Sequence, residues 1–297
     1  MRGSPQRAWA HLLALAAGAW ALLALVLGTD ASPADPSAGA WEPLSGIVAE
    51  AGCSPPPRWR RIDPAPGGAL PGPCTWRVER RGAVVHAAPV PAIGDDPLPV
   101  SMPSGSATEG LAGHRHVQAV PGGWLVAFNA GEFGAGVWWV SSDGSRRSWV
   151  GGEHVHGFVV TAGVVVAATG LCHMGIETRS VHRFAPDPDG VWRPTLVATL
   201  PGCAAAVAEE RPGRIIVAAG EKLVRVTLDG ETTTLGPLVT RPSSLAAGAD
   251  GTVFVGAYGG IARLSPPLYR EDVFVPPTCT TRHLRAGEPV CSCDPGP

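Results

Sequence analysis

The sequence predicts an all-β protein, a β-propeller of about five or six four-stranded blades with irregular N-terminal blades. Three observations lead to this prediction. Short apolar runs alternate with turn dipeptides, and no stretch beyond the N-terminal leader has helical periodicity. Four consecutive segments repeat one order of strands and turns. The chain of 297 residues contains 39 Gly and 31 Pro, as expected for a protein rich in turns.

The repeat is visible in the spacing of equivalent positions. If Trp124, Val164, Ile215 and Val253 match, the steps between them are 40, 51 and 38 residues. A period near 40 residues with four short strands per unit is typical of a propeller blade. The long step has a local cause, because the second segment carries GLCHMGIETRS where the third has only GEK.

Glycine-containing dipeptides indicate where hairpins turn. Asp143-Gly144, Asp189-Gly190 and Asp229-Gly230 precede the last strand of three segments. Glycine accepts the positive φ that tight hairpin turns need, so these pairs predict turns. Upstream, the run TWRVERRGAVVHAAP predicts two short strands around Arg81-Gly82.

Composition divides the chain into five parts. We expect a leader at 1–31, a linker at 32–40, an irregular β region with proline-rich loops at 41–115, four blades at 116–278, and a cysteine-containing tail at 279–297.

The leader has the pattern of a signal peptide, since Arg2 and Arg7 precede an uncharged run of 17 residues that ends at Gly28. Small residues then permit cleavage before Ser32 or before Trp41. The same run reaches the lower length limit of a membrane anchor, so an uncut leader is the alternative. Both predict a protein outside the cytoplasm: secreted, periplasmic or in the cell envelope, with membrane contact only through this segment if it is uncut.

The seven cysteines fit that location, because disulfides persist in oxidising compartments. Their spacing suggests local pairs but does not fix the connectivity. The pairs we expect are Cys53 with Cys74, Cys172 with Cys203, and Cys279 with either Cys291 or Cys293.

Charge and motifs exclude some functions. The formal net charge is −2 and the arginine doublets are scattered, so we expect no nucleic-acid partner. Gly-x-Ser-x-Gly, a phosphate-binding loop and His-Glu-x-x-His are all missing, which disfavours common hydrolases.

The repeats resemble those of extracytoplasmic β-propellers of the NHL and gluconolactonase-like kind. The resemblance covers Val117 to Val275 well and Trp59 to Pro99 poorly. It implies a fold and not an activity, because the matching motifs are architectural. The Glu, Asn and Asp metal ligands of gluconolactonase-like proteins have no match at equivalent channel positions; Asn129, Glu132 and Glu153 are the only nearby candidates.

Two His-x-His pairs stand 40 residues apart, each before an apolar run: His114 with His116, and His154 with His156. The first strand of each blade lines the central channel, so His116 and His156 would converge at its mouth. Neutral imidazole is a good ligand for a divalent metal ion, which is the cofactor this site would hold. The alternative is that the histidines are structural, two copies of one ancestral blade.

A metal site needs further donors. His86 is a candidate third ligand, with Glu132 or Glu153 as a candidate general base. The position aligned with His116 and His156 is Ser244 in the fourth segment. In the third segment it is near Cys203 or Ala204.

Two other surfaces are candidates for ligand contact. The inserted loop carries His173 and Met174, and insertions on one face of a repeat array often bind partners. Its Cys172 could join them in a copper site, although we expect that residue to be in a disulfide. Trp138 and Trp139 belong to an aromatic-rich blade and must face opposite ways in a strand; most of these aromatic side chains should lie in the core, with a flat-ligand platform as the alternative.

The sequence therefore predicts an exported propeller that is a binding or scaffold module for a protein, glycan or small molecule. The alternative is a metal-dependent propeller enzyme, a hydrolase or lyase acting on a small molecule. A membrane-anchored sensor ectodomain would require an uncut leader.

Overall fold

The computed structural model describes residues 46–49, 59–62, 74–90, 95–102, 109–174, 176–275, 279–283 and 289–293. The chain divides into residues 1–39 and 40–297, and every described residue belongs to the second unit. The expected leader and linker therefore lie outside the described residues. Within the described part, the chain forms strands and one short 3-10 helix, and no helix is long and apolar enough to cross a membrane.

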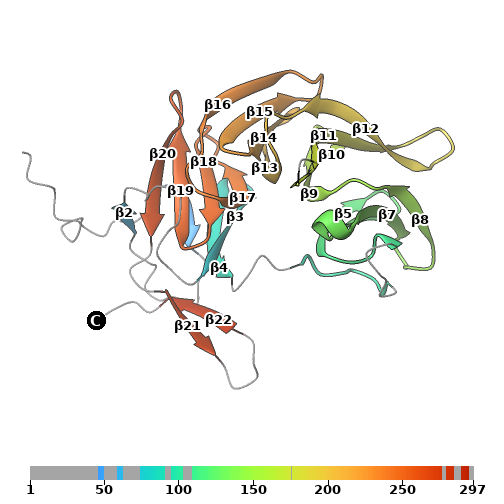
Figure 1. Cartoon of the computed structure of the whole chain (residues 1–297), viewed down its shortest axis with the longest axis horizontal. Coiled ribbons are helices and arrows are strands. Elements are labelled where there is room, and N and C mark those ends of the chain that lie inside the picture. Colours follow the sequence, from blue (N-terminus) through green and yellow to red (C-terminus); the bar gives the residue numbers. More distant parts are fainter. Residues whose placement is uncertain are drawn as a thin grey trace, which may run out of the picture. The chain divides into compact units, whose positions relative to one another are not determined.

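Four antiparallel sheets of consecutive strands follow one another along the chain, in colours from green to red in Figure 1. The first blade contains β5 (His114–Val120), β6 (Gly123–Asn129), β7 (Ala135–Ser141) and β8 (Arg147–Gly151). The second contains β9 (Val155–Thr161), β10 (Val164–His173), β11 (Ile176–Pro186) and β12 (Trp192–Thr199). The third contains β13 (Ala204–Arg211), β14 (Arg214–Ala219), β15 (Lys222–Thr227) and β16 (Thr232–Pro237). The fourth contains β17 (Pro242–Ala247), β18 (Val253–Ala257), β19 (Gly260–Ser265) and β20 (Arg270–Val275).

The N-terminal region completes the fold in two ways. It forms a three-stranded sheet in the order β1-β4-β3, from β1 (Ile47–Ala49), β3 (Thr75–Arg81) and β4 (Val84–Val90). It also supplies β2 (Arg60–Ile62), which pairs antiparallel with β20 at the outer edge of the fourth blade. The expectation of irregular N-terminal strands thus has a specific form, and the predicted strands around Arg81-Gly82 are β3 and β4.

The five sheets surround one cavity. The first strand of each complete blade contacts that of the next, in the order β5, β9, β13 and β17, and β17 contacts β3. Strands β3 and β17 lie side by side in Figure 1 although more than 160 residues separate them. Residues of all five inner strands line the same central cavity. The predicted all-β propeller of about five blades is confirmed.

Burial on both faces explains the apolar runs. Strand β18 is buried along its whole length, and the middle of β6, β10 and β14 is buried as well. Separate core clusters join the first blade to the second, the second to the third, the third to the fourth, and the fourth to the N-terminal sheet. A strand that packs between two neighbours has no polar face, so its pattern is a continuous apolar run.

The contact between the N-terminal sheet and the fourth blade uses serine hydroxyls as well as apolar packing. The backbone N–H of Val78 donates to Ser244 Oγ at 2.9 Å. Ser243 Oγ donates to the carbonyl oxygens of Trp76 and Gly256, at 3.1 and 2.8 Å. These bonds satisfy backbone groups of β3 that its own sheet leaves free, and they fasten the N-terminal sheet to the fourth blade.

On the other side, Asp95 and Asp96 connect the N-terminal sheet to the first blade. The N–H groups of Arg115 and Val117 donate to the carboxylates of Asp95 and Asp96, at 2.9 and 3.0 Å. Asp96 also accepts from the guanidinium of Arg77 at 3.5 Å. Carboxylates therefore satisfy the inner edge of β5.

The predicted hairpin turns are present, with φ of +73°, +80° and +93° at Gly144, Gly190 and Gly230. The tail, expected only to contain cysteines, includes a hairpin of β21 (Cys279–His283) and β22 (Pro289–Cys293). Its register places Cys279 opposite Cys293 and Cys291 opposite Thr281.

Candidate functional site in the central channel

Two cavities lie along the inner strands. The inner cavity has a volume of about 410 Å³ and is lined by all five inner strands. The mouth cavity has a volume of about 930 Å³ and lies where the inner strands begin. His116, His156 and Ser243 line both cavities, so the two lie next to each other at these residues. The mouth cavity is also lined by Asp95, His114, Arg115, Asn129 and Ala205.

The ring of His156 is held in one orientation by the neighbouring strand. Its Nε2 lies 2.7 Å from the carbonyl oxygen of Gly170. A carbonyl oxygen only accepts, so Nε2 carries the proton and Nδ1 of the neutral ring is an acceptor. Burial lowers the pKa of His156, the hydrogen bond to Gly170 opposes that effect, and His114 lowers it further. The ring is therefore uncharged at neutral pH.

His154 is fixed in the opposite tautomer. Asn129 donates from Nδ2 to the carbonyl oxygen of Val155, and its Oδ1 accepts from the N–H of Gly131. Oδ1 also lies 3.2 Å from Nδ1 of His154, so that nitrogen is the donor. Burial and the neighbouring His156 lower the pKa of His154.

His116 lies among charged and imidazole neighbours. Burial lowers its pKa most; Asp96 opposes the shift, and His156 and His114 add to it. His116 and His156 both line the mouth cavity and the inner cavity. His114 contributes its exposed ring to the mouth and lies 3.7 Å from Asp95.

Bulges shift the equivalent positions in the later blades by one residue. Ala205 and Ser243 line the mouth beside the histidines, rather than Ala204 or Cys203 and Ser244. The register of β13 shifts between Ala204 and Ala206, and that of β17 between Pro242 and Ser244. Each lining residue is thus the extra residue of a bulge, a feature common beside binding sites.

The other predicted members of a metal site lie elsewhere. His86 belongs to β4 and lines neither the inner cavity nor the mouth; it lines a neighbouring cavity that shares Glu79 and Asp96 with the inner one. Glu153 lines neither channel cavity and acts electrostatically on His182. Among the described residues, no group of three or more His, Cys, Asp or Glu side chains has an arrangement that could hold a metal ion.

Glu132 has a partner that the sequence did not indicate. It belongs to the 3-10 helix η2 (Gly131–Phe133), and its carboxylate contacts Nε2 of His173. His173 ends β10 in the inserted hairpin of the second blade. These two candidates, assigned separately from the sequence, therefore join adjacent blades beside the mouth. Met174, the next residue, is 89% exposed.

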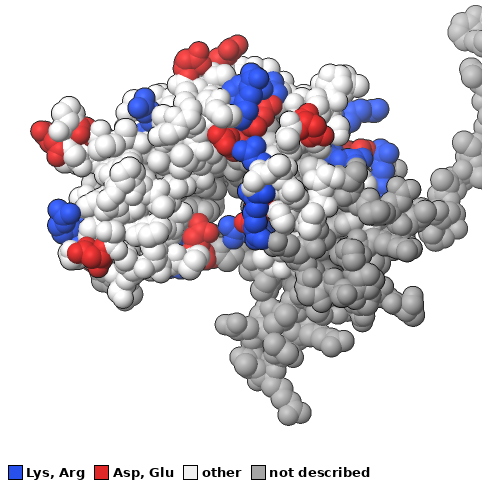
Figure 2. Space-filling view, turned by 180° about the vertical axis from the view of Figure 1, so that it is seen from behind, with Lys and Arg blue, Asp and Glu red and all other residues white. Residues whose placement is uncertain are grey.

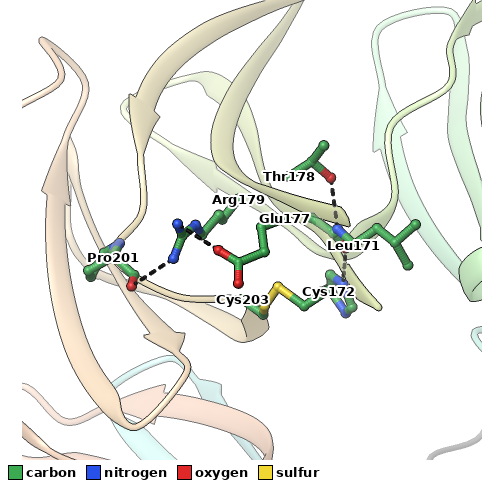
Figure 3. The surroundings of a disulfide bond; sticks show 9 residues. Leu171, Cys172, Glu177, Thr178, Arg179, Pro201 and Cys203 are labelled. Carbon is green, nitrogen blue, oxygen red and sulfur yellow. Dashed lines mark hydrogen bonds and ion pairs between the residues drawn. A yellow bond between two sulfur atoms is a disulfide. The ribbon is translucent and has the colours of Figure 1, made fainter. Parts of the chain in front are cut away.

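The predicted disulfide between Cys172 and Cys203 is present, with 6.0 Å between the two Cα atoms (Figure 3). It joins the inserted hairpin to the third blade. Arg179 spans the same gap by donating to the carbonyl oxygen of Pro201 at 3.3 Å. Because its sulfur is bonded, Cys172 is not a copper ligand. Cys74 is also disulfide-bonded, and its predicted partner Cys53 lies outside the described residues.

Charges of both signs line the channel. Arg80 and Glu209 form an ion pair at 2.7 Å, and both residues line the inner cavity. Figure 2 shows acidic and basic side chains interspersed over one face, which is hollowed near its centre. The mouth has imidazoles beside charged groups, because His116 and His156 line it together with Asp95 and Arg115.

Most aromatic side chains of the first blade pack against core clusters, as predicted. Trp138 and Trp139 face opposite ways and pack against different core clusters. The ring of Trp138 also packs edge-on against that of Trp149, with 5.1 Å between the ring centroids. However, Trp149 is 46% exposed and Phe133 is 71% exposed, so these two are not core residues.

Neither a protein-family model nor a curated protein matches the chain. Solved structures with similar coordinates include virginiamycin B lyase from Staphylococcus aureus, at 16% identity and a TM-score of 0.43, over 65% of this chain and 73% of that one. A gluconolactonase from Xanthomonas campestris matches at 13% identity and a TM-score of 0.39, over 54% and 56%. The extracellular domain assigned to a one-component system of B. thetaiotaomicron matches at 10% identity and a TM-score of 0.41, over 52% and 21%.

The chain spans less than two thirds of the last two structures. Gluconolactonase-like propellers are the class that the repeats resemble. Because identities and TM-scores are low, the fold is established by the sheets and their order, and the chemistry must be argued from the channel itself.

Proposed function

We propose that this protein is an exported β-propeller that binds a small molecule at the mouth of its central channel. The observation that supports it most is the placement of His116 and His156 on adjacent blades, lining both cavities. Cavities of several hundred Å³ with a few convergent polar groups are typical of small-molecule sites. The mouth and inner cavities, at about 930 and 410 Å³, have that size.

The imidazoles limit the kind of ligand. Because Nε2 of His156 donates to the carbonyl oxygen of Gly170, Nδ1 is the ring atom that can accept a hydrogen bond. We therefore expect a ligand that donates hydrogen bonds through hydroxyl or amine groups. The paired carboxylates and guanidinium groups disfavour a ligand that depends on one strong charge.

The disulfides support export. The bond between Cys172 and Cys203, and the one that includes Cys74, would persist in an oxidising compartment. With the predicted leader, they favour a secreted, periplasmic or cell-envelope location. As a scaffold, the protein would instead bind a protein or glycan partner through the exposed hairpin.

A plug at the mouth tests small-molecule binding. Ala205 is exposed and lines the mouth, so Ala205→Trp fills the cavity without entering the core. Ala83→Trp, at the exposed turn between β3 and β4, is the matched control. Each variant and the wild type would be screened by thermal shift against defined monosaccharides, polyols, amines and nucleosides. We expect a compound that raises the Tm of the wild type and the control but not of Ala205→Trp; equal shifts in all three would refute channel binding.

The second candidate is an axial divalent metal that polarises a carbonyl or activates water. One observation favours it. Metal-binding histidines typically donate the N–H of their other ring nitrogen to a carboxylate or backbone carbonyl, as Nε2 of His156 does to Gly170. Two imidazoles are fewer than a stable site needs, so a substrate or solvent would complete the ligands.

Metal content distinguishes the candidates. The protein would be expressed with its own leader, purified without chelators, and compared with the variant His116→Ala/His156→Ala. Near-stoichiometric metal that is lost in the folded variant would favour the enzyme. No retained metal, after incubation with Zn²⁺ and Co²⁺, would leave small-molecule binding as the better account.

A further inference from the structure

The inserted hairpin extends beyond the sheet that carries it. Pairing of β10 with β9 ends at Thr169, and pairing of β11 with β12 begins at Ser180. Residues 170–173 therefore pair only with residues 176–179 of the same hairpin. A two-stranded hairpin without a third strand is at best marginally stable in water, so this extension needs other attachments.

Attachments exist on both sides. Cys172 is bonded to Cys203 of the third blade, and His173 contacts Glu132 of the first. Figure 3 shows the disulfide side of this arrangement, with Arg179 reaching Pro201. The extension is thus fastened across three consecutive blades.

Both ends of the disulfide lie close in sequence to the channel mouth. Gly170, two residues before Cys172, accepts the Nε2–H of His156, and its own N–H donates to the carbonyl oxygen of His154 at 2.9 Å. Ala205, two residues after Cys203, lines the mouth cavity. Both ends of the disulfide are therefore two residues from backbone or side chains at the mouth, on the neighbouring strands β9 and β13.

We propose that the disulfide between Cys172 and Cys203 is a redox-sensitive clamp that positions His156 at the channel mouth. Only its effect on a ligand rests on the proposed function. A dithiol reductant would open the clamp by thiol–disulfide exchange: the Cys172–Cys203 bond breaks to two thiols, and the dithiol loses two protons and two electrons as it becomes a disulfide. Cys172 is exposed, so a thiolate can reach it.

Loss of the bond removes the covalent attachment of the extension on its third-blade side and leaves the hydrogen bond of Arg179 to Pro201 there. The carbonyl of Gly170 then moves with the hairpin, and the ring of His156 loses its fixed orientation. Breaking this one covalent bond therefore alters the orientation of His156 without substituting any residue that lines the mouth.

Diethyl pyrocarbonate, which modifies neutral accessible imidazoles, tests this without any ligand. The variant Cys172→Ser/Cys203→Ser removes only this bond, whereas reduction of the wild type also opens the disulfide of Cys74. Rates would be measured for each histidine by peptide mass spectrometry at pH 7. We expect His156 to react at least threefold faster in the variant, while exposed His114 keeps its rate.

Glu177→Gln is the control, because it removes the ion pair of Glu177 with Arg179 in the same hairpin and leaves the disulfide intact. It should react like the wild type. Equal His156 rates in the wild type and the double serine variant would overturn the clamp. If the double variant does not fold, natively reduced and alkylated wild-type molecules, sorted by which cysteines are modified, replace it in the same comparison.

The outcomes separate the two proposals. A faster His156 with no ligand found in the thermal-shift screen contradicts the binding function and supports the clamp. A ligand that binds the wild type and the double serine variant equally, with unchanged His156 rates, contradicts the clamp and supports the binding function.

Discussion

The Nε2 atom of His156 lies 2.7 Å from the carbonyl oxygen of Gly170, a bond that joins the start of β9 to the point where β10 leaves its sheet. In return, the N–H of Gly170 donates to the carbonyl oxygen of His154. The backbone at Gly170 therefore holds the second His-x-His pair from both sides. This bond determines that Nδ1 of His156 is the ring nitrogen left as an acceptor.

Gly170 should not tolerate a side chain. A Cβ at this position would lie 2.3 Å from the carbonyl oxygen of Thr178, a backbone atom that cannot move independently. We expect Gly170→Ala to lower the free energy of unfolding by about 2 kcal/mol, since overpacking typically costs about 1–3 kcal/mol. It should also raise the diethyl pyrocarbonate reactivity of His156. Urea unfolding monitored by tryptophan fluorescence measures the first effect.

Gly152→Ala is the control for that measurement, because a Cβ there meets only a ring atom of Trp149 at 3.8 Å. It should change stability by less than about 0.5 kcal/mol, as surface substitutions usually do. A similar loss in both variants would mean that the close approach at Gly170 is not the cause.

The disulfide should contribute to stability as well as to position. It closes a loop with a sequence separation of 31 residues. Loop-closure entropy in the unfolded chain predicts roughly 3–4 kcal/mol for a loop of this length. Cys172→Ser/Cys203→Ser should therefore lower the urea midpoint markedly at unchanged circular dichroism. A loss below about 1 kcal/mol would argue that the bond acts on the mouth and not on global stability.

Much of the fold could be predicted from local patterns, because blade strands are short and their turns carry glycine. The period, the Asp-Gly turns and the disulfide between Cys172 and Cys203 all follow from nearby residues. The pairing of β2 with β20 and of β1 with β4 could not be predicted, since such long-range partners leave no local signal.

The site was predicted less completely. The repeat placed His116 and His156 at equivalent positions, and both line the channel cavities. Alignment of apolar runs cannot register a bulge, so Ala205 and Ser243 were each missed by one residue. Asp95 and Asp96 lie in a segment without periodicity, and their role on β5 depends on backbone groups alone. The contact of Glu132 with His173 joins two loops whose approach only the folded chain defines.

A buried ion cluster in the third blade should be sensitive to loss of one partner. The side chain of Glu210 is 5% exposed; Arg225 donates to it through two nitrogens, and Arg214 lies 3.0 Å away. Burial alone would raise the pKa of Glu210, but the hydrogen bonds from Arg225 outweigh it and hold that pKa below its ordinary value. Arg225→Ala leaves a buried carboxylate short of donors.

We expect Arg225→Ala to cost about 3 kcal/mol, in the range for breaking a buried pair from one side. Arg193→Ala removes the exposed pair with Asp187 and should cost less than about 1 kcal/mol. Urea unfolding at pH 7 compares the two. Equal costs would show that the cluster is screened like a surface pair.

Four partly buried histidines, two of which line the channel, should make stability depend on pH. Burial is the main cause that lowers the pKa values of His116, His154, His156 and His182 below 6.5. Unfolded histidines bind protons at a higher pH than these folded ones, so below pH 6.5 the unfolded state holds more protons. The stability that depends on neutral rings is thus fully present above pH 6.5 and is lost as the pH falls through the folded values.

The double variant His116→Gln/His156→Gln removes two of the four groups, so its free energy of unfolding should fall less between pH 7.5 and pH 5.5 than that of the wild type. Glutamine keeps a polar side chain of comparable size, and His114→Gln, at a ring with 74% exposure, is the control. Urea unfolding at half-unit pH steps gives the three curves. A wild-type curve that stays flat below pH 6.5, or a double variant with an equal slope, would mean that the rings at the channel mouth are not held neutral by burial.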